Sequence, residues 1–246
     1  MKNNVSAIEI KNCKGFVLRG FLHLPESASE IVVMLHGFTG NKTEHAGHFR
    51  NLSRRLEKIG IASMRLDYHG NGESDGEFFD FVFEDALDDA LRMVEYAKSI
   101  DGIKKVHLLG FSMGGAIASL VANENIDKLI LWSPAGSMNN IANRVLVSWR
   151  TLENGNYYVP GFEMSKKFIE SINKFSMYQN CANIKNETII IQGTKDLSVL
   201  PEFSYKYSQE INGSVLHYID GAGHGYDSYE QREELYSLTI EFINRK

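Results

Sequence analysis

Residues 106–114 read Val-His-Leu-Leu-Gly-Phe-Ser-Met-Gly, and a helix-compatible stretch from Gly115 to Ala122 follows them. The apolar run at the start favours a buried strand, and the glycine–serine–glycine spacing predicts a tight turn from that strand into a helix. Such a turn projects the hydroxyl of Ser112 away from the backbone, where another molecule can reach it. We interpret the stretch as a nucleophile elbow, the turn that presents a reactive serine.

The two glycines of this turn have a steric reason. Gly110 and Gly114 each lie two residues from Ser112, and a side chain at either position would collide with the sharp turn. The following helix points its first N–H groups towards the place where negative charge develops when a serine attacks a carbonyl. A G-x-S-x-G match alone arises by chance, so the interpretation depends on the flanking strand and helix.

Composition excludes several classes of protein. The 246 residues, 43% hydrophobic and 23% charged, predict one globular domain over residues 1–246. A net charge of −5 without a basic cluster argues against nucleic acid or an anionic membrane surface as the partner. The two cysteines, Cys13 and Cys181, lack C-x-x-C spacing and favour free thiols in a reducing compartment. Without a signal-like segment or a run of about 18 apolar residues, we expect a cytoplasmic protein with no stable membrane association.

Apolar runs alternate with amphipathic segments, which is typical of a mostly parallel sheet covered by helices. We therefore predict an α/β fold with an eight-stranded sheet flanked by helices. The apolar run 31–35 is continuous, as expected of a strand buried on both faces. We expect strands at 7–10 and 15–25 (an antiparallel pair), 31–35, 61–66, 106–109, 129–132, 188–191 and 215–219, and helices at 44–59, 84–100, 115–122 and 229–245.

The alternation stops between the sixth and seventh strands. Residues 137–186 contain no convincing parallel strand, and an ordered excursion of this length is usually functional. We interpret it as a cap over the active site whose aromatic and aliphatic side chains line the acyl or aryl pocket; the same side chains are equally compatible with a homodimer surface. We expect one helix with Ile141, Val145, Leu146 and Trp149, an aromatic turn at 157–161, and a second helix with Phe168, Ile169, Ile172 and Phe175; the candidate substrate-binding residues are Trp149, Tyr157, Tyr158 and Phe162.

A serine hydroxyl needs a histidine to accept its proton and an acid to orient that histidine. His224 lies on the glycine-rich loop 221–225 after the last strand, and Asp196 lies on the loop after the strand 188–191. The order serine, acid, histidine is the one that this type of fold uses. Asp220 and Asp227 are the rival acids, but Asp220 is so close to His224 in sequence that we expect it to fix the loop instead.

The other histidines are better explained by packing or hydrogen bonding. His45 and His48 have a helical spacing that could bind a metal, but no third ligand is evident, so we predict no metal and no cofactor. We expect structural roles for His69, His107 and His217.

The oxyanion produced by serine attack needs two N–H donors. One is the backbone N–H of the residue after the serine, here Met113. The other belongs to the loop after strand 31–35, which reads His36-Gly37-Phe38-Thr39-Gly40, and the N–H of Phe38 is the candidate. The alternative interpretation of this loop is a plain glycine turn after a strand.

With these residues placed, the chain resembles the α/β-hydrolase fold over nearly its whole length. The loop 67–74, Asp-Tyr-His-Gly-Asn-Gly-Glu-Ser, resembles the D-x-x-G-x-G-x-S turn of the serine aminopeptidase and monoacylglycerol lipase branch. Within that branch the chain is similar to bacterial cinnamoyl (feruloyl) esterases, which share the 36–40 loop, the length and a cap at this point.

The resemblance implies that Ser112 is the nucleophile, His224 the general base and then acid, and Asp196 its orienting carboxylate. One position departs from the pattern, because Glu163 stands where these esterases carry a tyrosine that meets the substrate's phenolic hydroxyl. Tyr157 and Tyr158 are the candidates to take its place.

We expect a serine carboxylesterase that hydrolyses small to medium esters through an acyl-enzyme, with a small-molecule ester, preferably of a hydroxycinnamate, as its partner. A monoacylglycerol lipase, a thioesterase and a small peptidase remain alternatives, because the same three residues serve all of them. A binding protein that lost the chemistry is disfavoured, since such proteins usually lack one of the three residues.

Overall fold

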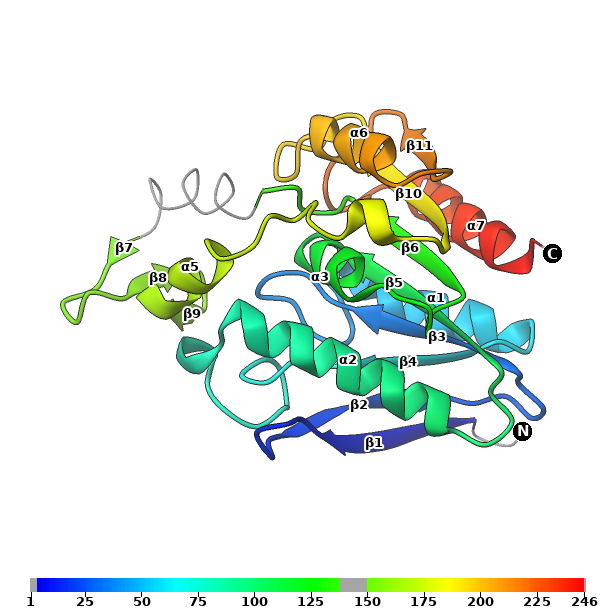
Figure 1. The fold of residues 1–246 in the computed structure, drawn as a ribbon, viewed down its shortest axis with the longest axis horizontal. Helices are drawn as coiled ribbons and strands as arrows, with labels where there is room; N and C mark the ends of the chain where they lie inside the picture. Colours follow the sequence, from blue (N-terminus) through cyan, green and yellow to red (C-terminus); the bar gives the residue numbers. More distant parts are fainter. Residues whose placement is uncertain (1–3, 138–149, 246) are drawn as a thin grey trace.

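A computed structural model describes residues 4–137 and 150–245 of the chain, and its centre is a sheet of eight strands (Figure 1). The strands lie side by side in the order β1-β2-β4-β3-β5-β6-β10-β11. Their bounds are β1 Val5–Lys11, β2 Val17–His23, β3 Glu30–Leu35, β4 Ala62–Leu66, β5 Lys105–Phe111, β6 Lys128–Trp132, β10 Glu187–Gly193 and β11 Val215–Ile219.

The sheet is mostly parallel. β2 pairs antiparallel with β1 and with β4, and every other neighbouring pair runs parallel. The prediction of a mostly parallel eight-stranded sheet that opens with an antiparallel pair is confirmed. Because the strands from β3 onwards point the same way, their carboxyl ends meet at one edge, where ligands bind in open α/β sheets.

Helices cover both faces of this sheet (Figure 1). α1 and α7 pack on one face, while α2, α3 and α6 pack on the other. The helices are α1 His48–Lys58, α2 Phe83–Ser99, α3 Met113–Val121, α5 Lys166–Ile172, α6 Pro201–Glu210 and α7 Tyr229–Asn244, with 3-10 turns η1 His45–Gly47, η2 Phe78–Asp80 and η3 Cys181–Asn183.

Strand β3 shows why the central strands are continuously apolar. Val32 and Met34 pack on the side of α1 and α7, whereas Ile31, Val33 and Leu35 pack on the opposite side. All five side chains are fully buried. A strand with helices on both faces has no solvent-facing side, so the alternation of polar and apolar residues disappears.

The segment between β6 and β10 carries a second, small sheet instead of the expected aromatic turn. β7 (Arg150–Thr151), β8 (Tyr157–Val159) and β9 (Phe162–Met164) form it, all antiparallel. The expectation of a turn over 157–161 was wrong because Tyr, Tyr and Val favour a strand, and the Pro-Gly pair after them turns the chain. β9 packs against η2, and α5 packs against α2, beyond the end of the main sheet (Figure 1).

The helices of this segment are partly as expected. α5 contains Phe168, Ile169 and Ile172, but it ends before Phe175. The helix expected around Ile141, Val145, Leu146 and Trp149 lies outside the described residues.

Two other features differ from expectation. The helix predicted over 44–59 begins at His48, because Glu44, Ala46 and Gly47 have positive φ angles of 62°, 49° and 74° that interrupt a continuous helix. Helix α6 was not predicted. In the described part of the chain, no helix has the length and apolar character needed to cross a membrane.

Candidate active site

The turn between β5 and α3 places Ser112 at the carboxyl edge of the sheet. Its φ of 57° and ψ of −118° lie outside the ordinary regions for a residue with a side chain. A methyl group built on Gly110 would lie 2.1 Å from the carbonyl oxygen of Gly114, and one built on Gly114 would lie 2.0 Å from that of Leu35. As expected, the structure leaves no room for a side chain at Gly110 or at Gly114.

Three predicted side chains form a continuous hydrogen-bonded line. His224 Nε2 lies 3.1 Å from Ser112 Oγ, and His224 Nδ1 lies 2.7 Å from Asp196 Oδ2. With a proton on Nδ1 donated to the carboxylate, Nε2 is left to accept the serine proton. The three residues come from the ends of β5, β10 and β11, which the sheet brings together.

The Asp196 carboxylate is buried and well supplied with donors. The backbone N–H groups of Ser198 and Val199 donate to Oδ1 at 2.9 and 2.8 Å, and Gln192 Nε2 donates to Oδ2 at 3.2 Å. Burial raises the pKa of Asp196, but the hydrogen bond from His224 and those from the backbone outweigh it and hold the pKa below its ordinary value. Asp196 is therefore ionised at neutral pH, and its charge can stabilise a protonated imidazole.

The two rival acids have other partners. Asp220 Oδ1 accepts a hydrogen bond from Thr194 Oγ1 at 3.1 Å, which ties the loop after β11 to the loop after β10. This side-chain contact is consistent with the expected role of Asp220 in fixing the loop. Asp227 lies 2.7 Å from His45 Nε2, and its side chain is 74% exposed.

The loop after β3 runs close beside the serine. A methyl group built on Gly37 would lie 3.4 Å from Ser112 Cβ. The next residue, Phe38, lines the same cavity as Ser112, and Met113 begins α3 directly after the serine. On the other side, the ring of Phe111 stacks on the His224 imidazole at 4.9 Å between centroids.

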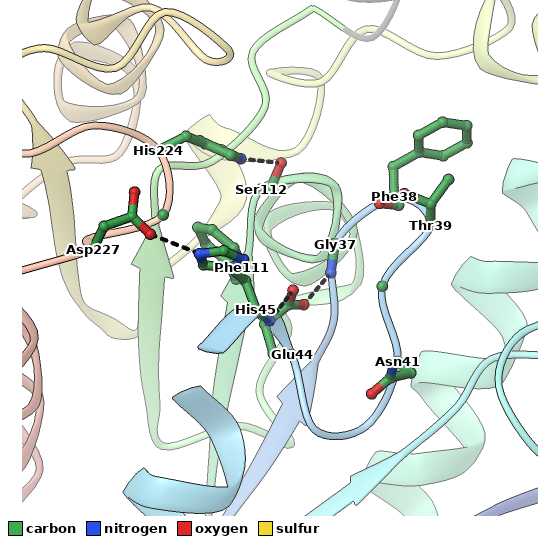
Figure 2. Close-up of a pocket in the computed structure, with 12 residues that line it drawn as sticks. Gly37, Phe38, Thr39, Asn41, Glu44, His45, Phe111, Ser112, His224 and Asp227 are labelled. Carbon is green, nitrogen blue, oxygen red and sulfur yellow. Dashed lines mark hydrogen bonds and ion pairs between the residues drawn. The ribbon is translucent and has the colours of Figure 1, made fainter. Parts of the chain in front are cut away.

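Glu44 holds the loop after β3 in shape. Its carboxylate accepts the Gly37 N–H at 2.7 Å and the His45 N–H at 2.9 Å, and Gly40 N–H donates to the Gly37 carbonyl at 3.1 Å. Figure 2 shows the Glu44 carboxylate directed at this loop from below Ser112. Sequence analysis missed Glu44, although its place on the loop that follows the Gly37 turn was a usable signal.

These residues line a cavity of about 490 Å³ that contains Ser112 and His224 (Figure 2). Its lining includes the carboxylates of Glu44 and Asp227 and, among the described lining residues, no lysine or arginine. None of the described candidate substrate-binding residues lines this cavity, and Trp149 lies outside the described residues. The lining comprises Gly37, Phe38, Thr39, Gly40, Asn41, Glu44, His45, Phe111, Ser112, His224, Gly225 and Asp227.

Phe38 connects the cavity to an aromatic cluster under the small sheet. Its ring centroid lies 5.6 Å from that of Phe78 and 5.1 Å from that of Phe168. Phe162 of β9 joins the cluster through Phe78, at 4.6 Å between centroids, and Phe81 joins through Phe168 at 5.6 Å. We refer to these five rings as the aromatic cluster.

The other residues of the small sheet are not among the described lining residues of the cavity. Tyr157 is half-buried and packs against the core, whereas Tyr158 is 47% exposed. Glu163 accepts hydrogen bonds from the amides of Asn154 and Asn156, both at 2.7 Å. These bonds occupy the Glu163 carboxylate within the hairpin and lower its pKa.

The side chains of the remaining histidines are hydrogen-bonded within the protein except that of His69, whose buried ring stacks on Phe16 without a hydrogen bond to either nitrogen from the described residues. His48 lies 2.8 Å from both Tyr236 Oη and the Gly225 carbonyl, and His107 lies 3.0 Å from Glu30. Within residues 4–137 and 150–245, no three histidine, cysteine or acidic side chains are grouped as metal ligands would be.

Comparisons with known proteins give relatives over most of the chain. Residues 26–167, more than half of the chain, match the family described as serine aminopeptidase, S33. Est1E from Butyrivibrio proteoclasticus, solved with ferulic acid bound, has a TM-score of 0.80 and 25% identity over 97% of this chain and 100% of that chain. The AB hydrolase superfamily protein YisY of Bacillus subtilis is 24% identical over 87% of this chain and 91% of its own length.

A shorter match has higher identity. Monoglyceride lipase of Homo sapiens is 41% identical over 86 residues, which are 33% of this chain and 27% of that protein. The matches include esterases, lipases and other hydrolases, so they support the hydrolase type without fixing a substrate. The chain belongs to the serine aminopeptidase family S33, and it is an α/β-hydrolase of the esterase and lipase type.

Proposed function

We propose that this protein is a serine carboxylesterase that hydrolyses small to medium carboxylic esters through an acyl-enzyme. The observation that carries the proposal is the line from Ser112 to His224 to Asp196, with contacts of 3.1 and 2.7 Å, inside a cavity at the carboxyl edge of the sheet. A nucleophile, a base in contact with it and an acid that orients the base are the parts that acyl transfer requires.

The first half of the reaction is acylation. Ser112 Oγ attacks the ester carbonyl carbon while His224 Nε2 takes its proton, and the carbonyl oxygen becomes an oxyanion. The backbone N–H groups of Phe38 and Met113 stabilise that oxyanion. When the tetrahedral species collapses, the bond to the alcohol breaks and His224 gives the proton to the departing oxygen.

Deacylation repeats these steps with water. His224 takes a proton from water, the hydroxide oxygen attacks the acyl carbon, and collapse returns the proton to Ser112 Oγ and releases the carboxylic acid. Asp196 stays ionised and stabilises the imidazolium in both halves. Every proton is carried by the protein's own side chains and water.

In this proposal the described part of the predicted cap, residues 150–186, sets the acyl specificity. The aromatic cluster begins at Phe38, beside the proposed oxyanion site, and supports an apolar or aromatic acyl group there. The likeness to Est1E, which binds ferulic acid, supports a hydroxycinnamate ester as one substrate. Glu163 is occupied by two asparagine amides, so recognition of a phenolic hydroxyl would fall to Tyr157 or Tyr158.

A monoacylglycerol lipase is the second candidate. It is favoured by the 41% identity to human monoglyceride lipase over 86 residues. The two candidates differ in acyl length, because a lipase hydrolyses long-chain glycerides faster than acetates or ferulates.

The test is a substrate profile of the wild type and Ser112→Ala. It compares p-nitrophenyl esters from acetate to palmitate, methyl ferulate, methyl p-coumarate and a monoacylglycerol. Loss of a nucleophilic serine lowers kcat by roughly a millionfold, so an unchanged rate in Ser112→Ala would exclude the proposed mechanism. Ser119→Ala, which alters a buried serine in α3 away from the cavity, is the matched control.

A preference for the hydroxycinnamates in the wild type would support the feruloyl subtype. Fast turnover of simple acyl esters with little on methyl ferulate would leave a general carboxylesterase. Fastest turnover of the monoacylglycerol would favour the lipase.

A further inference from the structure

The position of His224 defines where the leaving alcohol must lie. In the proposed reaction the proton on His224 Nε2 passes to the departing oxygen, so that oxygen lies within hydrogen-bond reach of this nitrogen. The carbonyl oxygen of the ester, which becomes the oxyanion, instead lies towards the backbone N–H groups of Phe38 and Met113. The alcohol therefore extends along the wall of the cavity that continues from His224, away from the aromatic cluster.

That wall is built by the residues next to His224 and by η1. Gly225 and Asp227 follow His224 on the same loop, and His45 faces them from η1. Figure 2 shows Asp227 and His45 on the His224 side of Ser112, and Phe38 on the opposite side with its ring pointing away. His45 Nε2 lies 2.7 Å from Asp227 Oδ1, and a methyl group on Gly225 would meet both side chains, at 2.8 and 2.7 Å.

The wall is negatively charged. Asp227 and Glu44 are the carboxylates among the described lining residues, which include no lysine or arginine. A charge at the mouth of a cavity with low-dielectric walls acts on a bound ion more strongly than it would in bulk water.

We propose that Asp227, held in place by His45, determines specificity for the leaving alcohol and favours esters whose alcohol carries a positive charge over neutral esters of the same shape. The inference rests on the proposed esterase function. Because the Asp227 side chain is 74% exposed, the preference is modest and weakens with salt, as expected of an attraction through solvent.

The competing explanation is that the His45–Asp227 contact only fixes the loop that carries His224. Asp227→Asn separates the two explanations, because asparagine keeps an oxygen that accepts from His45 Nε2 but removes the charge. A purely structural role would change the rates of charged and neutral esters in proportion. A specificity role changes their ratio.

The experiment compares kcat/KM for butyrylcholine and 3,3-dimethylbutyl butyrate, which share the acyl group and the alcohol's shape and differ in charge. It uses the wild type, Asp227→Asn and Asp227→Lys at about pH 8 and at about 20 and 500 mM NaCl. Asp101→Asn, which removes an exposed charge at the opposite end of the sheet, is the matched control.

At low salt the choline ester is expected to be the better wild-type substrate. The ratio of the two kcat/KM values should fall by about threefold to tenfold in Asp227→Asn, drop below one in Asp227→Lys, decrease with salt, and stay unchanged in Asp101→Asn. An equal ratio in the wild type and Asp227→Asn, or a proportional loss on both esters, would overturn the inference. The esterase proposal fails separately, if Ser112→Ala retains the wild-type rate on the neutral ester.

Discussion

The carboxylate of Glu44 accepts the backbone N–H of Gly37 at 2.7 Å, although the two residues lie at opposite ends of the loop after β3. Glu44 adopts a φ of 62° and ψ of 168° to do so, a conformation that costs free energy in a residue with a side chain. The contact fixes the residue that immediately precedes Phe38, the proposed oxyanion donor. Glu44 is therefore expected to act on the reaction through the geometry of this loop.

Glu44→Ala should lower kcat by about 10- to 100-fold with little change in KM for a small ester. The donor that it positions acts on the oxyanion, which exists only after attack, and a misplaced donor costs transition-state stabilisation. Steady-state kinetics with p-nitrophenyl acetate measures both constants, and circular dichroism checks that the variant is folded.

Glu44→Gln is the informative partner of this variant. Its amide oxygen can accept the Gly37 N–H but cannot also accept the His45 N–H as the second carboxylate oxygen does. It should recover most of kcat. Equal losses in Glu44→Ala and Glu44→Gln would contradict a role based on the bond to Gly37.

Gly110→Ala should destabilise the fold by about 3 kcal/mol or more, because overpacking against a rigid backbone cannot be relieved by a rotamer change. The added methyl group would lie 2.1 Å from the Gly114 carbonyl oxygen. Urea unfolding measures the loss. The matched control is Gly223→Ala, where a methyl group meets nothing within 4 Å, and its change should stay within about 0.5 kcal/mol. Similar stability of the two variants would refute the steric account of the elbow.

Phe162→Ala should reduce the preference for larger acyl groups. The ring of Phe162 packs on Phe78, which in turn packs on Phe38. Removing the Phe162 ring therefore weakens the packing that holds Phe38 in place at the proposed acyl site. An aromatic pair contributes about 0.5–1.5 kcal/mol, so the ratio of kcat/KM for p-nitrophenyl hexanoate to acetate should fall by about threefold to tenfold. Phe79→Ala removes a 44% exposed ring beside the cluster and is the control. An unchanged ratio in Phe162→Ala would mean that the aromatic cluster does not determine acyl preference.

Much of the site was predictable because it depends on local sterics and on sheet topology. The glycine spacing around Ser112 specifies a turn that tolerates no side chain two residues before or two residues after the serine. Asp196 and His224 follow parallel strands whose carboxyl ends must meet at one edge, where Ser112 also lies. Ser112 and His224 could therefore be placed together, although they are 112 positions apart in sequence.

The contacts that were missed depend on tertiary packing. The apolar periodicity after Glu44 suggested a helix from that residue, but Glu44, Ala46 and Gly47 have positive φ angles that periodicity cannot reveal. The strand pair at Tyr157–Val159 and Phe162–Met164 is too short for a clear alternation. The packing of Phe162 on Phe78 joins residues far apart in sequence, for which no local signal exists.

The buried carboxylate of Asp89 should make the free energy of unfolding depend on pH, independently of catalysis. Its buried carboxylate accepts the His69 N–H at 2.7 Å and the Asn12 amide at 2.9 Å. Burial raises the pKa of Asp89 to about 7; these two hydrogen bonds oppose the rise, and the nearby acids Asp88 and Asp85 add to it. An unfolded aspartate has a pKa of about 3.9, so between about pH 4 and pH 7 the folded state holds a proton that the unfolded state has released. The stability that Asp89 contributes is therefore fully present below about pH 4 and is lost as pH rises through 7.

Asp89→Asn should remove this part of the pH dependence, because asparagine resembles the protonated acid and does not titrate. Urea unfolding of both proteins at a series of pH values between about 5 and 8 gives the free energy of unfolding of each. The difference between variant and wild type should shift in favour of the variant as pH rises, by at most about 1.4 kcal/mol per pH unit. A difference that stays constant over this range would mean that Asp89 is ionised throughout, and that its two hydrogen bonds outweigh its burial.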